Sequence, residues 1–343
     1  MNRVIITGAT GFIGSHIVEQ FCQNNISVGC LIRESSSLTY LKDLNVVYHY
    51  GDIRNFSTLV KAFKGYDTVI HNAAYVADWG DYDLFYRINV YGTQNVLFAC
   101  IENNIQHIIL TGSNASYGEE NNYSAKDESF PYRAHYNYFL DNIFPSKLNY
   151  YRETKAMATE KAAAIAEKNN LDLTILEPVW VFGEREFSSG FYEYMKSVKD
   201  GMFIVPGSRN NKFHVIYAPD CAQAFLKAYK KRLKGIHRIL IGNKKPVPMH
   251  YIYSCFLKNA GLKKPIFLPK WIVYPAALIL EFFYTILKIK TPPLLSRARV
   301  NMFYDNIEYS VKNAEELLGF MNNYSLEDGI CRTVSWYKQN HYI

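Results

Sequence analysis

The sequence has no cysteine or histidine pattern that is typical of a metal or redox centre. Its six cysteines stand far apart, with no CxxC pair, and several lie in apolar periodic segments, as buried reduced thiols do. Its nine histidines form no HExxH or other ligand spacing. We therefore expect reduced thiols and no metal site.

A long basic run and a secretory leader are also missing. The formal net charge of +7 over 343 residues is modest and is not concentrated in one stretch, which argues against a nucleic-acid partner. The N-terminal residues lead directly into a strand pattern and contain no apolar h-region with a cleavage site. We expect a cytoplasmic protein, and one apolar segment near the C-terminus leaves membrane association open.

Short β-branched runs alternate with helical patterns through the first half of the chain. Strands are predicted at Val4–Thr7, Val28–Ile32, Val46–His49, Thr68–His71, His107–Thr111 and Leu173–Leu176. Helices are predicted between them at Ile13–Asn24, Leu59–Phe63, Tyr82–Asn103 and Tyr151–Asn169. This alternation builds a parallel sheet with helices on both faces, so we expect an α/β, doubly wound Rossmann fold.

The pattern loosens after Pro178. Phe213–Tyr217 and His237–Ile241 are candidates to return to the sheet, whereas 191–206 and 245–343 are mostly helical. We expect a dinucleotide-binding domain over residues 1–178, with returns near 213–242. A smaller, mostly helical substrate lobe would be formed by 179–212 and 243–343. The 28 tyrosines of the chain would suit an aromatic-lined pocket there.

A glycine-rich turn follows the first predicted strand and opens the first helix. It reads Thr7-Gly8-Ala9-Thr10-Gly11-Phe12-Ile13-Gly14. Glycines at this junction allow a tight turn and close backbone approach to a pyrophosphate, which then faces the free N–H groups of the helix. The TGxxGxxG spacing resembles that of the extended short-chain dehydrogenases/reductases. The resemblance implies that Gly8, Thr10, Gly11, Phe12, Ile13 and Gly14 bind a nicotinamide dinucleotide.

The end of the second strand bears on the choice of cofactor. Alignment with the family places its usual acidic residue at Ile32, and Arg33 follows. A guanidinium with the nearby Ser36 hydroxyl would suit a 2′-phosphate, so we favour NADP(H) over NAD(H). In the alternative interpretation Arg33 is a solvated charge and Glu34 binds the ribose.

Three further segments resemble cofactor-lining segments of the family. The resemblance implies an adenine-contacting pair, Asp52 and Ile53, after the third strand. It also implies a cofactor-lining loop, Asn72-Ala73-Ala74, after the fourth. Pro178 and Val181 belong to a segment near the nicotinamide, in which Glu177 stands where the family usually has arginine. Read alone, each segment is also consistent with ordinary strand-end turns.

Tyr151 and Lys155 lie four residues apart, on one face of a predicted helix. That geometry predicts that Lys155 lowers the pKa of the Tyr151 phenol and binds the nicotinamide ribose. The family resemblance adds Ser113, from Thr111-Gly112-Ser113, as the residue that orients the substrate oxygen. It adds Asn89 as the helix asparagine that positions the lysine, although a purely structural asparagine fits equally well. Ser113, Tyr151, Lys155 and Asn89 are the predicted catalytic set.

Two segments, Ala77–Tyr86 and Pro292–Arg299, resemble the 3β-hydroxysteroid dehydrogenase-like branch of the family. This implies an oxidoreductase that interconverts a hydroxyl and a ketone on a small or hydrophobic, lipid-like substrate. The first alternative is a nucleotide-sugar epimerase or dehydratase with tightly held cofactor. There Arg209 or Lys212 would replace the diphosphate-binding arginine, which aligns with Phe213. The second alternative is a non-catalytic NADP(H) sensor.

The apolar segment Trp271–Leu287 has two interpretations. Its length and its Pro275 and Glu281 make it a poor membrane span. It is either a helix packed over the substrate pocket or a monotopic helix that rests on a membrane, flanked by lysines. The family resemblance also implies a homodimer formed through the helices at Tyr82–Asn103 and Tyr151–Asn169.

Overall fold

The computed structural model describes residues 3–118, 124–187, 190–202, 204–263 and 265–343. Seven parallel strands form the main sheet in the order β10-β6-β5-β4-β1-β2-β3. The strands are β1 (Arg3–Thr7), β2 (Ser27–Ile32), β3 (Val46–Tyr50), β4 (Thr68–His71), β5 (His107–Thr111), β6 (Asp172–Pro178) and β10 (Ile236–Ile241). The order 3-2-1-4-5-6 is that of dinucleotide-binding folds, with β10 added beside β6. The predicted Rossmann fold is confirmed.

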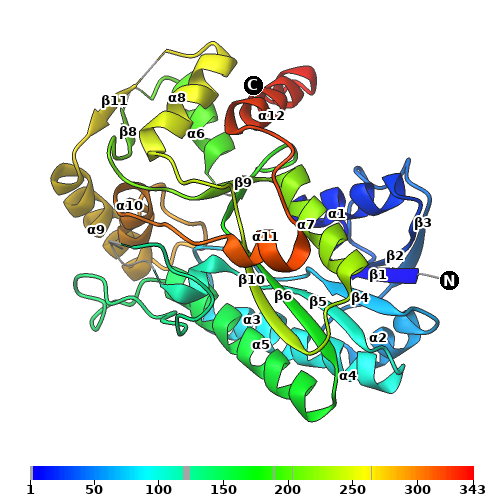
Figure 1. The fold of residues 1–343 in the computed structure, drawn as a ribbon. Helices are drawn as coiled ribbons and strands as arrows, with labels where there is room; N and C mark the ends of the chain where they lie inside the picture. The colour runs from blue at the N-terminus through cyan, green and yellow to red at the C-terminus, as the bar shows by residue number, and fades with distance from the viewer. Residues whose placement is uncertain (1–2, 119–123, 188–189, 203, 264) are drawn as a thin grey trace.

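Helices cover both faces of this sheet (Figure 1). On one face lie α1 (Phe12–Gln23), α7 (Ala218–Lys231) and α11 (Lys312–Leu318); on the other lie α2 (Phe56–Phe63), α4 (Gly92–Glu102) and α5 (Leu148–Lys168). The alternation within β1 explains the two layers, because Ile6 packs in the same cluster as Ile17 of α1 whereas Ile5 packs with Leu59 of α2. A strand buried on both faces reads as an unbroken apolar run, as this one does.

One predicted helix is divided into three parts. The expected Tyr82–Asn103 helix consists of α3 (Tyr82–Phe85), a π-helical turn η1 (Tyr86–Tyr91) and α4. The π turn lies over the catalytic region and contains Asn89, and such insertions commonly occur at functional sites. The hydrophobic periodicity of the sequence could not reveal the π turn, because a single inserted residue leaves the apolar spacing on either side almost unchanged.

Of the two predicted returns to the sheet, the second is confirmed and the first is wrong. Ile236–Ile241 does join the sheet as β10, beside β6. Val215–Tyr217 forms β9, which instead pairs with β7 (Trp180–Phe182) in a separate two-stranded sheet. The position next to β6 is already occupied by β10, so the short β9 cannot bond to that edge.

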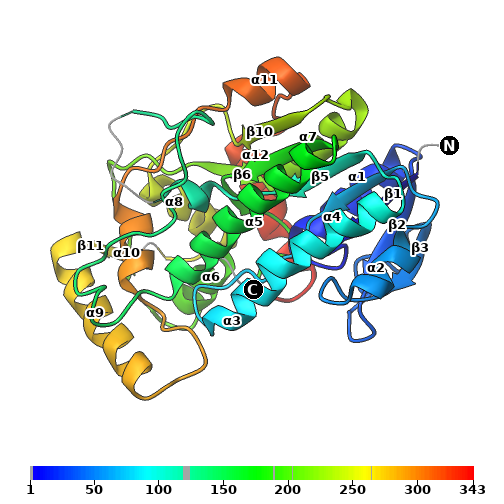
Figure 2. The same cartoon turned by 90° about the horizontal axis from the view of Figure 1, so that it is seen from below.

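The C-terminal part is mainly helical, as expected. Its elements are α6 (Phe191–Lys199), α8 (Met249–Ala260), α9 (Lys270–Ile286), α10 (Arg297–Tyr304) and α12 (Leu326–Gln339), with the short pair β8 (Ile204–Pro206) and β11 (Ile266–Leu268). Figure 2 shows α9 and α10 at one end of the molecule, away from β1–β3. Among the described residues, no helix is long and apolar enough to cross a membrane.

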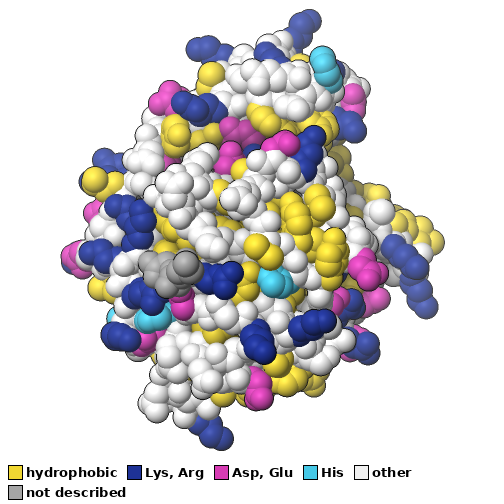
Figure 3. Space-filling model, turned by 90° about the vertical axis from the view of Figure 1, so that its right-hand side faces the viewer, with side chains coloured by type: hydrophobic (Ala, Val, Ile, Leu, Met, Phe, Trp, Pro, Cys, Tyr) yellow, Lys and Arg dark blue, Asp and Glu magenta, His cyan; other side chains and the backbone are white. Residues whose placement is uncertain are grey.

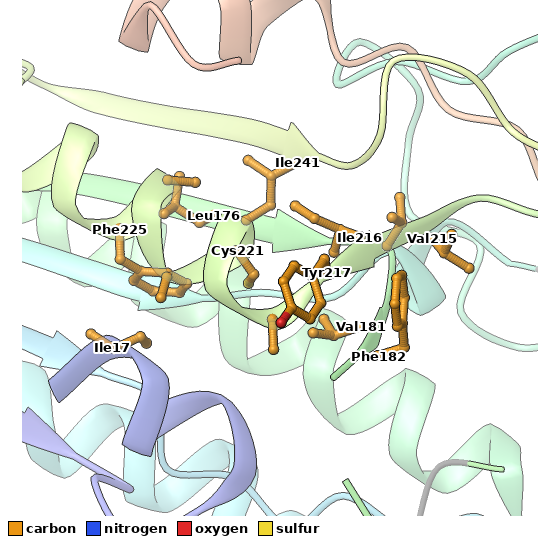
Figure 4. Packing of buried hydrophobic residues seen from close by; sticks show 14 of the residues in the cluster. Ile17, Leu176, Val181, Phe182, Val215, Ile216, Tyr217, Cys221, Phe225 and Ile241 are labelled. Atoms are coloured by element: carbon orange, nitrogen blue, oxygen red, sulfur yellow. The ribbon is translucent and has the colours of Figure 1, made fainter. Parts of the chain in front are cut away.

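A single apolar cluster runs from the sheet into this part. In Figure 4, Leu176 and Ile241 at the ends of β6 and β10 lie close to Ile216 and Tyr217 of β9 and to Val181 of β7. The same cluster contains Phe256 of α8 and Tyr337 of α12. The lobe is therefore anchored on the carboxyl ends of the strands, the edge at which α/β folds place their ligands.

Candidate active site

The glycine-rich turn joins β1 to α1 as predicted, and its three glycines have different structural roles. Gly8 has a φ of +70°, and a Cβ there would lie 2.7 Å from the Ala73 nitrogen. At Gly14 a Cβ would lie 2.0 Å from the Gly8 carbonyl oxygen. Both glycines are thus required by backbone packing, whereas Gly11 is exposed and begins α1 with no side-chain cap. The first N–H groups of α1 remain available to an anion, so the turn fits a pyrophosphate.

Two arginines stand at the far end of the expected adenosine site. Arg33 is exposed directly after β2, and its backbone N–H donates to Ser36 Oγ at 3.0 Å. Arg54, which the sequence reasoning missed, binds both carboxylate oxygens of Asp52 at 3.0 and 2.6 Å. Arg33 and Arg54 both help to hold the pKa of Asp52 below its usual value, with the Arg54 hydrogen bond the larger cause. In the sequence, only the spacing of Asp52 and Arg54 after β3 indicates that these two residues could pair.

Ile53 lies differently from the simplest expectation for an adenine contact. Its side chain is buried in the core, where its Cδ1 would lie 2.7 Å from a Cβ at Gly92, and its carbonyl accepts from Asn95 Nδ2 at 2.9 Å. Its side chain supports the start of α4.

The Asn72-Ala73-Ala74 loop is fixed to the glycine turn and to β5. Asn72 Oδ1 accepts from Thr111 Oγ1 at 3.0 Å, and the Ala73 N–H donates to Thr7 Oγ1 at 3.2 Å. Beneath this loop His71, whose contacts the sequence does not predict, hydrogen-bonds Thr7 Oγ1 at 2.7 Å and Thr93 Oγ1 at 3.0 Å. Burial, with a smaller effect of Lys155, lowers the pKa of His71 to about 3. The neutral imidazole therefore ties the loop to β1 and α4 without adding charge.

Asn89 connects the π turn to the catalytic helix. Its Oδ1 accepts from the Tyr75 N–H at 2.7 Å, and its Nδ2 donates to the Tyr75 carbonyl at 3.2 Å and to Thr154 Oγ1 at 3.1 Å. Thr154 immediately precedes Lys155 on α5. The side chain thus positions α5 and the 73–75 loop relative to each other, and its contacts are those of a positioning residue.

Ser113 and Tyr151 meet as the sequence predicts. Ser113 caps the short 3₁₀ helix η2 (Asn114–Tyr117), where its Oγ accepts from the Ala115 N–H at 3.2 Å. The Ser113 hydroxyl also lies near the Tyr151 phenol and, as a potential hydrogen-bond partner, lowers the pKa of that phenol. Burial has the larger effect and raises the pKa of Tyr151 above its usual value. The expected lowering by Lys155 is therefore not what the structure shows, and Tyr151 is held as the protonated phenol.

Lys155 is almost fully buried on the same helix. Its Nζ donates to the Thr111 carbonyl at 2.7 Å, at the carboxyl end of β5. Burial lowers the pKa of Lys155 to about 8, while the neighbouring Glu177 opposes that shift. The ammonium is consequently close to its titration point near neutral pH.

Glu177 stands in a buried network at the end of β6. Its Oε2 accepts from Tyr117 Oη at 2.6 Å, its Oε1 accepts from Tyr132 Oη, and Arg238 Nε lies 3.7 Å from Oε2. Both carboxylate oxygens are thus used as acceptors. Arg238 comes from β10, the strand beside β6 in the sheet. Pro178 and Val181, which follow Glu177, are both buried.

The two segments that carry the 3β-hydroxysteroid dehydrogenase-like resemblance lie against each other. Arg299 Nε donates to Asp78 Oδ2 at 2.5 Å, and Trp79 Nε1 donates to the Ile289 carbonyl at 2.8 Å. These contacts join the loop after β4 to α10 and to the segment that follows α9.

Comparison with known proteins places these motifs in one family. A model described as "NAD dependent epimerase/dehydratase family" matches residues 4–242. The chain is 26% identical to the 3beta-hydroxysteroid-dehydrogenase/decarboxylase isoform 2 of Arabidopsis thaliana over 96% of its length, although it spans only 61% of that protein. It is 25% identical to the sterol-4-alpha-carboxylate 3-dehydrogenase, decarboxylating, of Mus musculus, covering 97% of this chain and 90% of that one.

Epimerases are also among the relatives. The chain is 26% identical to the N-acetyl-alpha-D-glucosaminyl-diphospho-ditrans,octacis-undecaprenol 4-epimerase of Escherichia coli O157:H7, covering 98% of this chain and 95% of that one. Among solved structures, gox2253 superposes with a TM-score of 0.80 at 23% identity over the whole of both chains. The UDP-glucose 4-epimerase of Thermus thermophilus, solved with NAD, has a TM-score of 0.75 at 19% identity over 98% of this chain and 99% of that one. The chain belongs to the NAD dependent epimerase/dehydratase family, within the extended short-chain dehydrogenases/reductases, and is an NAD-dependent enzyme that acts on CH–OH groups.

Proposed function

We propose that this enzyme interconverts a ketone and a secondary alcohol on a hydrophobic, lipid-like substrate, with NADP(H) as the favoured cofactor and reduction as the favoured direction. The placement of Ser113 near the Tyr151 phenol, beside a Lys155 whose Nζ is held by the Thr111 carbonyl at 2.7 Å, carries the proposal. When bound, the nicotinamide supplies the hydride that adds to the carbonyl carbon.

The protein's own part in the reaction is to orient and protonate the substrate oxygen. Ser113 and Tyr151 would both donate hydrogen bonds to the carbonyl oxygen, and Tyr151 would transfer its proton as negative charge develops there. Because burial keeps the pKa of this phenol high, the residue is in the acid form that reduction requires. Solvent then returns the proton to the phenolate.

An aromatic pocket beside the catalytic helix suits a hydrophobic substrate. It has a volume of about 620 Å³ and is lined by Tyr136, Asn137, Tyr138, Phe139, Lys270, Trp271, Tyr274 and Asn301. The side chain of Asn149 bonds both backbone groups of Tyr136, at 3.2 and 3.0 Å. Asn149 lies two residues before Tyr151, so one wall of the pocket is fixed to the helix that holds the proton donor.

The position that would bind a sugar-nucleotide diphosphate is poorly suited to it. Phe213 is buried with its ring against Trp180. Lys212 Nζ bonds Glu308 Oε2 at 2.5 Å, which neutralises one of the two cations near it, and Arg209 is exposed. The names of the relatives also favour lipids, since two of them act on sterols and the epimerase acts on an undecaprenol-linked sugar.

The preference for NADP(H) depends on Arg33, which is exposed directly after β2. Its guanidinium would lie near the 2′ position of the adenosine ribose, where a phosphate adds negative charge, whereas Arg54 is already paired with Asp52. The neutral 2′-hydroxyl of NAD(H) gains less from Arg33.

The test is consumption of NADPH by the purified chain, with NADH in parallel, against sterol ketones, long-chain 3-oxo compounds and small cyclic ketones. Tyr151→Phe removes the proton donor. Tyr150→Phe is the matched control, because it removes a phenol one residue away whose ring packs on Phe85 and Tyr82. We expect turnover with a hydrophobic ketone, loss of it in Tyr151→Phe and retention in Tyr150→Phe.

The opposite result also has a definite meaning. If no ketone is reduced but a nucleotide-linked sugar is epimerised without net change in the cofactor, the epimerase alternative replaces this proposal. Tight NADPH binding with no turnover of either substrate class would instead identify a sensor.

A further inference from the structure

Helix α9 has its one acidic residue buried and a row of apolar residues exposed. Glu281 is the only charged residue between 271 and 287, and it is buried, with both carboxylate oxygens bonded to Arg297. The outward residues are apolar instead and recur at helical spacing. They are Trp271 (76% exposed), Ile272, Ile279, Phe282, Phe283 and Ile286 (58% exposed). A helix facing water normally shows the reverse pattern.

A neighbouring loop extends this apolar face. Phe139 and Ile143 are 63% and 75% exposed, in the segment before α5. Arg297 holds the segment in place, because its NH1 donates to the Phe139 carbonyl at 2.6 Å and its NH2 to the Phe144 carbonyl at 2.7 Å. Since the same guanidinium binds Glu281, one buried ion pair sets the positions of both the helix and the loop.

The ends of the face favour a lipid surface over a protein partner. Lys288 and Lys290 follow the helix and are exposed, and Trp271 marks its other end; aromatic and basic residues at the borders of an apolar face are typical of helices that lie in a membrane interface. The aromatic pocket opens within the face, since Phe139, Trp271 and Tyr274 line it. A protein partner seated there would cover the pocket. On the opposite side of the molecule, lysines and arginines are interspersed with acids and with separate apolar patches (Figure 3).

We propose that the outer face of α9 together with the 139–143 segment docks this enzyme on an anionic lipid bilayer, with the pocket mouth turned toward the lipid. The helix lies in the interface without crossing the membrane. Helix α9 lies beyond the part of the chain that the family model matches, which ends at residue 242, whereas the 139–143 segment lies within it. Docking is independent of the reductase activity; only the entry of a substrate from the bilayer rests on the proposed function.

Co-sedimentation of the full chain with vesicles tests the docking. We expect the protein to pellet with phosphatidylcholine vesicles that contain phosphatidylglycerol, and to pellet less with phosphatidylcholine alone or at high salt. The combined variant Ile279→Asp, Phe283→Asp and Ile286→Asp should bind about 100-fold more weakly or worse, since it replaces three half-exposed apolar side chains by charges. Met321→Asp, the same change at an apolar residue that is 74% exposed beside α11, should bind as the unmodified chain does.

Tryptophan fluorescence gives a second readout that needs no activity. Trp271 is 76% exposed, whereas Trp79 is buried and Trp180 and Trp336 are half-buried. Addition of vesicles should therefore shift the emission to shorter wavelength, and Trp271→Phe should remove the shift. Equal pelleting of the triple variant and the unmodified chain would overturn the proposal. So would an oligomer that the triple variant converts to monomers with no vesicle binding, because the face would then join copies of this chain. These outcomes are independent of ketone reduction.

Discussion

Helices α5 and α9 each carry a charged residue that faces inward, but the two charges have different roles. In α5 the buried Lys155 and the phenol of Tyr151 face the carboxyl ends of the strands, and exposed polar residues such as Glu160 face water. In α9 the buried Glu281 is completely paired with Arg297, while the outward residues are apolar. The buried charge of α5, Lys155, can titrate near the catalytic residues, whereas the buried charge of α9, Glu281, only stabilises the structure.

The difference shows how a buried charge can be interpreted. The Glu281–Arg297 pair is satisfied by the protein itself, so it holds the fold together and has no capacity left for a ligand. Lys155 has a carbonyl and a distant carboxylate as partners, and its pKa lies near neutrality. A buried group with a perturbed pKa at a strand end is a functional candidate, and one in a closed ion pair is not.

The largest expected effect separates the two helices by activity. Tyr151→Phe should lower kcat/KM for a ketone by about 100- to 10,000-fold, the usual contribution of a positioned general acid, and leave vesicle binding unchanged. The triple α9 variant should keep its kcat/KM for a soluble ketone and lose vesicle binding. Steady-state kinetics and co-sedimentation on the same preparations measure both. Parallel loss of both properties in either variant would show that the two regions are not independent.

The second effect is on stability. Glu281→Gln leaves Arg297 buried with its partner charge removed, which should cost about 3–5 kcal/mol of unfolding free energy. Glu160→Gln, the same change on the exposed face of α5, should stay within about 0.5 kcal/mol. Urea denaturation measures both. A Glu281→Gln protein as stable as the Glu160→Gln control would mean that the pair does not hold the lobe.

The third effect concerns the cofactor. Arg33→Ser removes a guanidinium from the expected 2′-phosphate site, so the ratio of kcat/KM for NADPH to that for NADH should fall by about 10- to 100-fold, the equivalent of one or two charge-assisted hydrogen bonds. Arg3→Ser changes an exposed arginine at the opposite end of β1 and should leave the ratio unchanged. An unchanged ratio in Arg33→Ser would favour the interpretation in which Arg33 is only a solvated charge.

The sequence predicted the sheet and the site unequally. Strands with unbroken apolar runs and a glycine turn of defined spacing are local features, so β1 and α1 were found from the sequence, and Tyr151 was found from its spacing to Lys155. Ser113 was assigned through the family resemblance. The π turn, Arg54 and the His71 contacts depend on residues brought together by the fold. Glu177 was noticed only as a departure from the family, and its pairing with Arg238, 61 positions later in the sequence, could not be read from local pattern. The outward apolar face of α9 was one of two interpretations, because periodicity gives two faces without saying which is buried.

The smallest effect concerns the charge around Lys155. The groups that face it are the Thr111 carbonyl, the neutral His71 and Glu177. Burial lowers the pKa of Lys155 to about 8, and Glu177 opposes this shift. Activity that needs the ammonium should be complete below that pH and decline as pH rises through it. Glu177→Gln removes the negative charge and leaves Arg238 unbalanced, so the alkaline limb of the kcat/KM profile should move to lower pH, by about one unit or less. Asp172→Asn makes the same change at the other end of β6 and should not move it. A limb that stays fixed in Glu177→Gln would mean that Glu177 serves only to hold Tyr117 and Tyr132 in place.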